Sequence, residues 1–123
     1  MSLAFSACKG PEGDLPEPYR RMAVPEQTLA STEARERGRA LFLRHCALCH
    51  GDRADGKGVR RENLTSPPRD FRDPSWRRST SPRRVFFAIR EGRPHTPMPA
   101  WKALEVADCW DLTAYVLAAG ETP

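Results

Sequence analysis

The 123-residue sequence lacks a long hydrophobic run, and its most apolar stretch, residues 85–89, is far too short to span a bilayer. Lysine is scarce, because only 3 of the 20 basic residues are lysine and the other 17 are arginine. The net charge of +4 favours acidic partners. No nucleic-acid-binding motif accompanies this charge, so no nucleic-acid partner is expected.

The first 30 residues lack the composition of a folded core. Residues 1–8 have neither a charged start nor a long apolar stretch, yet residues 5–8 resemble the end of a bacterial lipoprotein signal. We interpret residues 1–8 as the remnant of such a segment, with Cys8 either lipidated as a membrane anchor or incidental. Residues 9–30 contain four prolines and form either a linker or a strap anchored by Tyr19, Met22 and Val24.

Residues 31–123 are expected to form one small all-α domain with about three main helices and long loops. A first helix is predicted from a Ser31 or Thr32 cap to about residue 46. A second spans residues 82–91, with Ser81 as cap and Gly92 as stop, and a third spans about residues 105–118. Residues 51–80 read as loops. Cys109 falls in the third helix, where we expect a buried free thiol; nothing supports a disulfide to Cys8.

The strongest signal is Cys46-Ala47-Leu48-Cys49-His50, a C-x-x-C-H motif that is typical of covalent haem attachment. Two thiols at this spacing can each form a thioether with one vinyl group of a porphyrin, and the adjacent imidazole can bind its iron. A thiol redox pair or a zinc site are the alternatives. Zinc would need a fourth ligand from His45, His95 or a distant cysteine, because no second C-x-x-C pair is present.

A second axial ligand is predicted at Met98, which lies 48 residues after His50 in Pro97-Met98-Pro99. Flanking prolines exclude a helix and stiffen the segment, which suits a weak thioether bond to iron. His/Met ligation raises the reduction potential of a haem. His95 is the rival ligand, three residues away.

Four motifs, in order, resemble the class I cytochrome c family over residues 33–118: residues 46–51, 55–58, 89–92 and 96–101. The resemblance implies a cytochrome c fold around one covalent haem c, tethered by Cys46 and Cys49, with His50 and Met98 as axial ligands. It also implies that Gly38 and Phe42 meet Leu112 and Tyr115 where the first and last helices cross. A carbonyl of Pro67 or Pro68 is expected to accept the His50 N–H. The propionate-binding candidates are Arg69, Trp76 and Trp101.

The implied function is single-electron transfer between redox protein partners, such as a quinol-oxidising complex or a terminal oxidase. We expect a monomer in a bacterial periplasm. Arg60, Arg61, Arg83 and Arg84 either surround the partner surface or form a solvated face, and for Arg83 and Arg84 the solvated face is favoured. The competing interpretations are a haem enzyme or ligand-binding subunit with a labile distal ligand, and a zinc-binding structural module.

Overall fold

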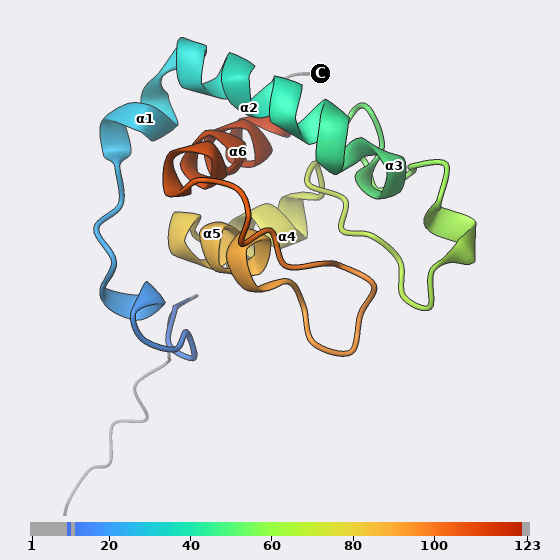
Figure 1. Ribbon diagram of the computed structural model, residues 1–123, viewed down its shortest axis with the longest axis horizontal. Helices are drawn as coiled ribbons and strands as arrows, with labels where there is room; N and C mark the ends of the chain where they lie inside the picture. The colour runs from blue at the N-terminus through green and yellow to red at the C-terminus, as the bar shows by residue number, and fades with distance from the viewer. Residues whose placement is uncertain (1–9, 11, 122–123) are drawn as a thin grey trace, which may run out of the picture.

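The computed structural model describes residues 10 and 12–121, and this part of the chain is helical with no strand (Figure 1). The predicted lipidation at Cys8 lies outside the described residues. The helices in chain order are η1 (Tyr19–Arg21), α1 (Glu26–Ala30), α2 (Thr32–His45), α3 (Ala47–His50), η2 (Arg61–Asn63), α4 (Pro74–Ser79), α5 (Pro82–Glu91) and α6 (Val106–Ala119). In this part of the chain, no helix is long and apolar enough to cross a membrane.

The three main predicted helices correspond to α2, α5 and α6. The Ser31 side chain caps α2 by accepting a hydrogen bond from the Ala34 amide at 3.2 Å. Ser81 caps α5 in the same way, with Pro82 at its first position, and Gly92 ends it at a φ of 69°. The regions predicted as loop or linker contain four short helices in addition, namely η1, α1, η2 and α4.

Helices α2 and α6 cross at a very close contact (Figure 1). A Cβ atom on Gly38 would lie 2.0 Å from the Asp111 carbonyl oxygen and 2.9 Å from the Cβ of Tyr115. One turn further along, the rings of Phe42 and Tyr115 meet at 5.0 Å between centroids. The predicted crossing is therefore present, and glycine is required there because no side chain fits between the two backbones.

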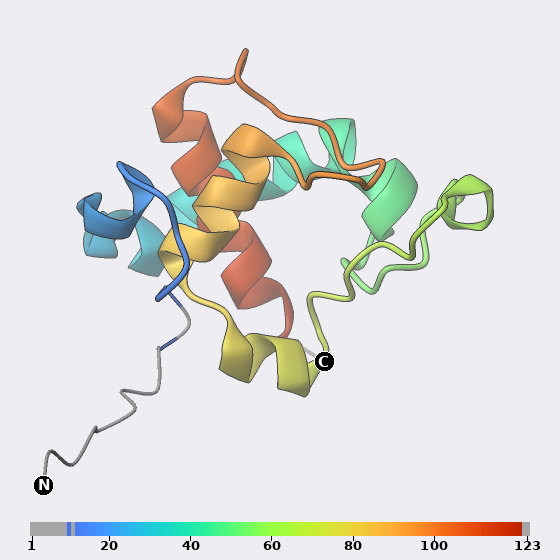
Figure 2. The same ribbon diagram turned by 90° about the horizontal axis from the view of Figure 1, so that it is seen from below.

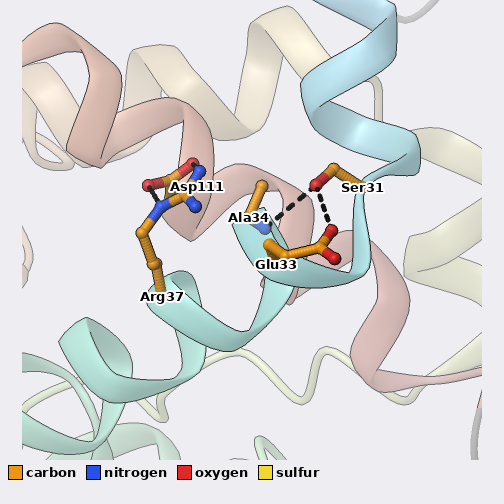
Figure 3. A network of polar contacts seen from close by, with 5 residues as sticks. All are labelled: Ser31, Glu33, Ala34, Arg37 and Asp111. Atoms are coloured by element: carbon orange, nitrogen blue, oxygen red, sulfur yellow. Dashed lines mark hydrogen bonds and ion pairs between the residues drawn. The ribbon is translucent and has the colours of Figure 1, made fainter.

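An ion pair that the sequence does not signal joins the same two helices (Figure 3). Arg37 donates two hydrogen bonds to Asp111, with Nε 2.9 Å from Oδ2 and Nη2 3.3 Å from Oδ1. The Asp111 residue is only 6% exposed, whereas the Arg37 side chain is 62% exposed. The guanidinium of Arg37 therefore compensates the negative charge of the buried Asp111 carboxylate from the solvent side.

Helix α5 packs on the opposite side of α6 and completes the core. Phe86 stacks on Trp110 with 4.2 Å between ring centroids, and Val85 and Ile89 are also buried. Helix α6 supplies most of the core, because eight of its residues are buried, including the free thiol of Cys109. The predicted buried free cysteine is confirmed.

Residues 12–30 lie against the domain and follow the edge of α5 and α6 (Figures 1 and 2). Leu15 is 3% exposed, and Tyr19, Met22 and Val24 pack against the core cluster, as the strap alternative describes. We call residues 12–24 the N-terminal strap. Its packing gives the small domain additional apolar contacts.

Arg83 and Arg84 hold this strap rather than facing a partner. Arg83 donates to the Met22 carbonyl at 2.6 Å and to the Glu12 carboxylate at 2.9 Å, and Arg84 pairs with Asp14. Two arginines in the first turn of a helix are unfavourable to its dipole. The acidic residues of the strap compensate for this, so the misfit with the helix dipole is explained within the chain and gives no support to a partner role for Arg83 and Arg84.

Candidate functional site

The C-x-x-C-H motif folds into a single tight turn after α2. Cys46 caps α3, and its carbonyl accepts hydrogen bonds from the Cys49 amide at 3.2 Å and the His50 amide at 2.9 Å. Both thiols are free and half-buried. One helical turn therefore presents two thiols and an imidazole together, which is the donor set that covalent haem attachment requires.

The loop after the motif closes around this turn through backbone hydrogen bonds. The amides of Gly56, Gly58 and Arg60 donate in turn to the carbonyls of His50 (2.7 Å), Cys49 (3.1 Å) and Leu48 (2.9 Å). A Cβ on Gly58 would lie 2.2 Å from the Leu48 oxygen, so only glycine allows this approach. The loop thus holds the attachment turn from outside through main-chain hydrogen bonds.

His50 is oriented by a hydrogen bond from its Nδ1 to the Arg69 carbonyl oxygen, at 3.0 Å. Because a carbonyl can only accept, Nδ1 carries the proton and Nε2 is left with the lone pair that binds a metal. Burial lowers the pKa of His50, so the imidazole is held in the neutral form that a ligand needs.

The acceptor for His50 differs from the expected one. We expected a carbonyl of Pro67 or Pro68, but the oxygen belongs to Arg69, one residue further on. The Pro68 carbonyl instead faces Gly56, where an added Cβ would lie 3.0 Å from it. The two prolines shape the approach of this loop, and the residue after them makes the contact.

Aromatic side chains surround His50. Phe71 stacks on the imidazole with 4.6 Å between centroids and an interplanar angle of 23°, and Phe42 lies 6.3 Å from it. Trp76 packs on Phe71 at 5.0 Å. Sequence reasoning missed Phe71, although an aromatic residue between two charged Arg-Asp pairs, shortly after Pro67 and Pro68, could have signalled it.

Met98 lies in a loop that folds back on the end of α5. Its amide donates to the Thr96 hydroxyl at 3.3 Å, and its carbonyl accepts from the Arg93 amide at 3.4 Å. The Trp101 amide donates to the Ile89 carbonyl at 2.9 Å. We call residues 93–104 the Met98 loop, and its backbone is fixed on both sides of the methionine.

Trp101 brings the Met98 loop to the attachment turn. Its ring lies 5.0 Å from the ring of His45, the residue immediately before Cys46. His95 is exposed and adopts a positive φ of 62° in the same loop. Thus two segments more than 40 residues apart in sequence meet at His45, the residue before the first cysteine of the motif.

The three propionate candidates occupy different surroundings. The Arg69 side chain is exposed while its carbonyl faces His50, Trp76 belongs to the aromatic cluster, and Trp101 packs on His45. Their roles toward a haem propionate stay predictions.

Two observations bear on the alternatives of a thiol redox pair and a zinc site. Burial raises the pKa of the Cys46 thiol to about 12, so in the metal-free chain Cys46 is not an activated redox nucleophile. Across residues 12–121, no group of three or more His, Cys, Asp or Glu side chains could hold a metal ion. The zinc alternative therefore has no ligand set in the described part of the chain.

The helical fold and the C-x-x-C-H turn together define a c-type cytochrome domain. Residues 33–116 match the family described as cytochrome c oxidase, cbb3-type, subunit III, and the chain belongs to that family. It accordingly carries covalently bound c-type haem, and its chemistry is haem-based electron transfer. The turn fits this group, because it carries two free thiols and an imidazole whose proton is on Nδ1, which leaves Nε2 for the iron.

A solved structure has the same fold. A chain of the reducing HAO-like protein complex of Kuenenia stuttgartiensis is similar, with a TM-score of 0.59 and 22% sequence identity. The likeness covers 69% of this chain and 41% of that chain, so the present chain spans less than half of that neighbour. No curated protein matches the sequence.

Proposed function

We propose that this protein is a monohaem single-electron carrier in which His50 and Met98 are the axial ligands. The observation that carries the proposal is the His50 geometry: Nδ1 is bonded to the Arg69 carbonyl at 3.0 Å, and Cys46 and Cys49 lie on the same turn. When bound, the haem supplies an iron that accepts and releases one electron.

Residues of the chain fix the orientation and the protonation of the proximal ligand, His50. The Arg69 carbonyl holds the proton on Nδ1 and fixes the plane of the imidazole. Phe71 and Phe42 pack beside that ring and limit the access of water to it. Such packing and hydrogen bonding favour transfer of an electron without coupled movement of a proton.

On the distal side, Met98 fits the role of a thioether ligand because its loop is rigid. The flanking prolines restrict the backbone, and hydrogen bonds to Arg93 and Thr96 fix the peptide groups on either side of it. We propose that the resulting His/Met ligation gives a higher reduction potential than bis-histidine ligation would.

The proposed partner surface surrounds the attachment turn. Leu48 within the motif is 48% exposed and Val59 in the closing loop is 82% exposed, and the hydrogen bond from the Arg60 amide to Leu48 brings them close. Arg60 and Arg61 are exposed beside them. A small apolar patch with a basic edge suits brief contacts with an acidic redox protein.

The physiological setting that we propose is a bacterial periplasm. There a monomeric carrier would exchange electrons with a quinol-oxidising complex or a terminal oxidase. A lipid on Cys8 would keep it at the membrane. Mass spectrometry of the native full-length protein tests this last point, because an unmodified Cys8 would exclude the tether.

The test of the proposed function is spectroscopic and uses protein produced with a haem-attachment system. The reduced spectrum should show sharp haem bands that survive acid–acetone extraction, and the ferric protein should show the weak methionine–iron charge-transfer band. Met98→Leu should lose that band and lower the midpoint potential. Met22→Leu, at a methionine of the strap, is the matched control and should leave both unchanged.

Two results would contradict the proposal. Covalent haem without the charge-transfer band in the parent protein would reject Met98 as ligand. Spontaneous binding of carbon monoxide by the intact ferrous protein would indicate an open iron and favour the ligand-binding alternative.

A further inference from the structure

The carboxylate of Glu91, the last residue of α5, joins two segments that are distant in sequence. One oxygen accepts a hydrogen bond from the Tyr19 hydroxyl at 2.5 Å, and the other pairs with the Lys102 ammonium at 3.2 Å. Tyr19 belongs to the N-terminal strap, and Lys102 lies in the Met98 loop. We call these three residues the Tyr19–Glu91–Lys102 bridge.

The strap end of this bridge is firmly held. The Tyr19 ring packs edge-on against Phe87 at 4.8 Å and lies 6.1 Å from Phe86. Three residues after Tyr19, the carbonyl of Met22 is bound by Arg83 at 2.6 Å. The Tyr19 hydroxyl therefore approaches Glu91 from a fixed support, which reduces the entropy that the hydrogen bond must overcome.

The other end of the bridge lies next to the anchors of the Met98 loop. Arg90 donates to the Leu104 carbonyl at 2.6 Å and to the Lys102 carbonyl at 3.4 Å. A Cβ on Gly92 would lie 2.8 Å from the Met98 carbonyl oxygen, so the loop touches the end of α5 directly. Three consecutive α5 residues, from Ile89 to Glu91, thus hold the returning part of the loop.

From this arrangement we infer that Tyr19 is a positioning residue for the distal ligand: through Glu91 and Lys102, the N-terminal strap holds the Met98 loop against α5. The inference rests on the proposed ligation by Met98. It assigns to a segment outside the family match, residues 33–116, an influence on the iron site.

The physical effect is a shift between two populations, one with methionine on the iron and one with the methionine displaced. A ligand added from solution competes with Met98, so its apparent affinity rises in proportion to the fraction of protein with a free iron position. Any contact that stabilises the closed loop therefore weakens binding of the added ligand. Removing one hydrogen bond should strengthen that binding by about two- to tenfold.

The experiment titrates imidazole into the ferric holoprotein and follows loss of the methionine–iron band. Tyr19→Phe removes only the hydroxyl and should increase the apparent imidazole affinity by about two- to tenfold. Glu91→Ala removes both contacts and should have a larger effect. Tyr115→Phe makes the same chemical change against Phe42 at the α2–α6 crossing, and should bind imidazole as the parent does.

A double variant separates the bridge from general loosening of the strap. In the Glu91→Ala background, Tyr19→Phe should have no further effect, because the hydroxyl has lost its acceptor. Amide hydrogen exchange provides a readout that does not depend on iron chemistry. The Trp101 amide, bonded to the Ile89 carbonyl, should exchange faster in Tyr19→Phe than in Tyr115→Phe.

The outcomes distinguish ligation of the iron by Met98 from the role of Tyr19. If the parent protein lacks the methionine–iron band, ligation by Met98 is wrong and the inference is overturned with it. If the band is present but Tyr19→Phe binds imidazole like the parent, ligation stands and only the role of Tyr19 is overturned. An equal effect of Tyr19→Phe with and without Glu91 would also overturn it.

Discussion

Replacing Gly38 by alanine gives the sharpest test of the α2–α6 contact. In a helix interior, this exchange alone should stabilise by about 1 kcal/mol. Here, however, the added methyl carbon would lie 2.0 Å from the Asp111 carbonyl oxygen and 2.6 Å from the carbonyl carbon. Carbon atoms in contact are normally about 3.5–4.0 Å apart, and both atoms belong to the backbone of α6. The helices must therefore separate.

The size of the effect follows from two opposing terms. Overpacking of a core typically costs about 1–3 kcal/mol, and a backbone obstacle places this site at the upper end. After subtraction of the gain in helix propensity, we expect a net loss of about 1–2 kcal/mol. For a chain of this size, that loss lowers the melting temperature by about 4–8 °C.

The assay is denaturant and thermal unfolding of the holoprotein, followed by circular dichroism. Ala40→Gly is the matched control, because Ala40 is exposed on the same helix. This variant should lower the free energy of unfolding by about 1 kcal/mol, through the loss of helix propensity only. If Gly38→Ala proved as stable as the parent or more stable, the close crossing would not exist as described.

Three further predictions concern polar contacts. Arg37→Ala should lower the free energy of unfolding, because it leaves the buried Asp111 carboxylate without its partner. Arg77→Met should cost about 1 kcal/mol, since its guanidinium donates to a carbonyl in the last turn of α6 at 2.8 Å. Burial and the Glu91 hydrogen bond raise the pKa of Tyr19 to about 12 from 10, so its contribution is complete below pH 10 and lost between pH 10 and about 12. Unfolding measured across that range should show a smaller pH-dependent loss in Tyr19→Phe than in the parent.

The two arginine variants each have a control of the same chemistry. Arg39→Ala on α2 and Arg78→Met on α4, both at exposed positions, should change the free energy of unfolding by less than about 0.5 kcal/mol. Equal losses in Arg37→Ala and Arg39→Ala, or in Arg77→Met and Arg78→Met, would contradict the assigned contacts. A pH profile of Tyr19→Phe that parallels that of the parent would contradict the third prediction.

Local signals predicted the main helices well. Ser31 and Ser81 are caps, Pro82 is at a first helical position and Gly92 follows a last one, and each acts through contacts only a few residues away. The attachment turn is likewise local, since its three functional groups occupy five consecutive residues. Such features can be predicted because neighbouring residues alone determine them.

Features that depend on distant segments could not be predicted. The acceptor for His50 is a main-chain carbonyl. Every residue has this group whatever its side chain, so the sequence could indicate the region of the acceptor but could not identify Arg69. The roles of Arg83 and Arg84 depend on where the strap returns to α5. The short helix α1 owes its position to packing against α6 rather than to its own five residues.

The main-chain closure of the attachment turn bears on how such a protein can diverge. The amides of residues 56, 58 and 60 donate hydrogen bonds to the carbonyls of residues 48–50, so both partners of each bond are main-chain groups. Only the glycines at 56 and 58 are required as residue types for these bonds. Most of the exposed residues from 52 to 61 can therefore change in charge and size without moving His50 or the two thiols. Selection for a new redox partner can act on the surface of this loop while the chemistry beneath it is inherited unchanged.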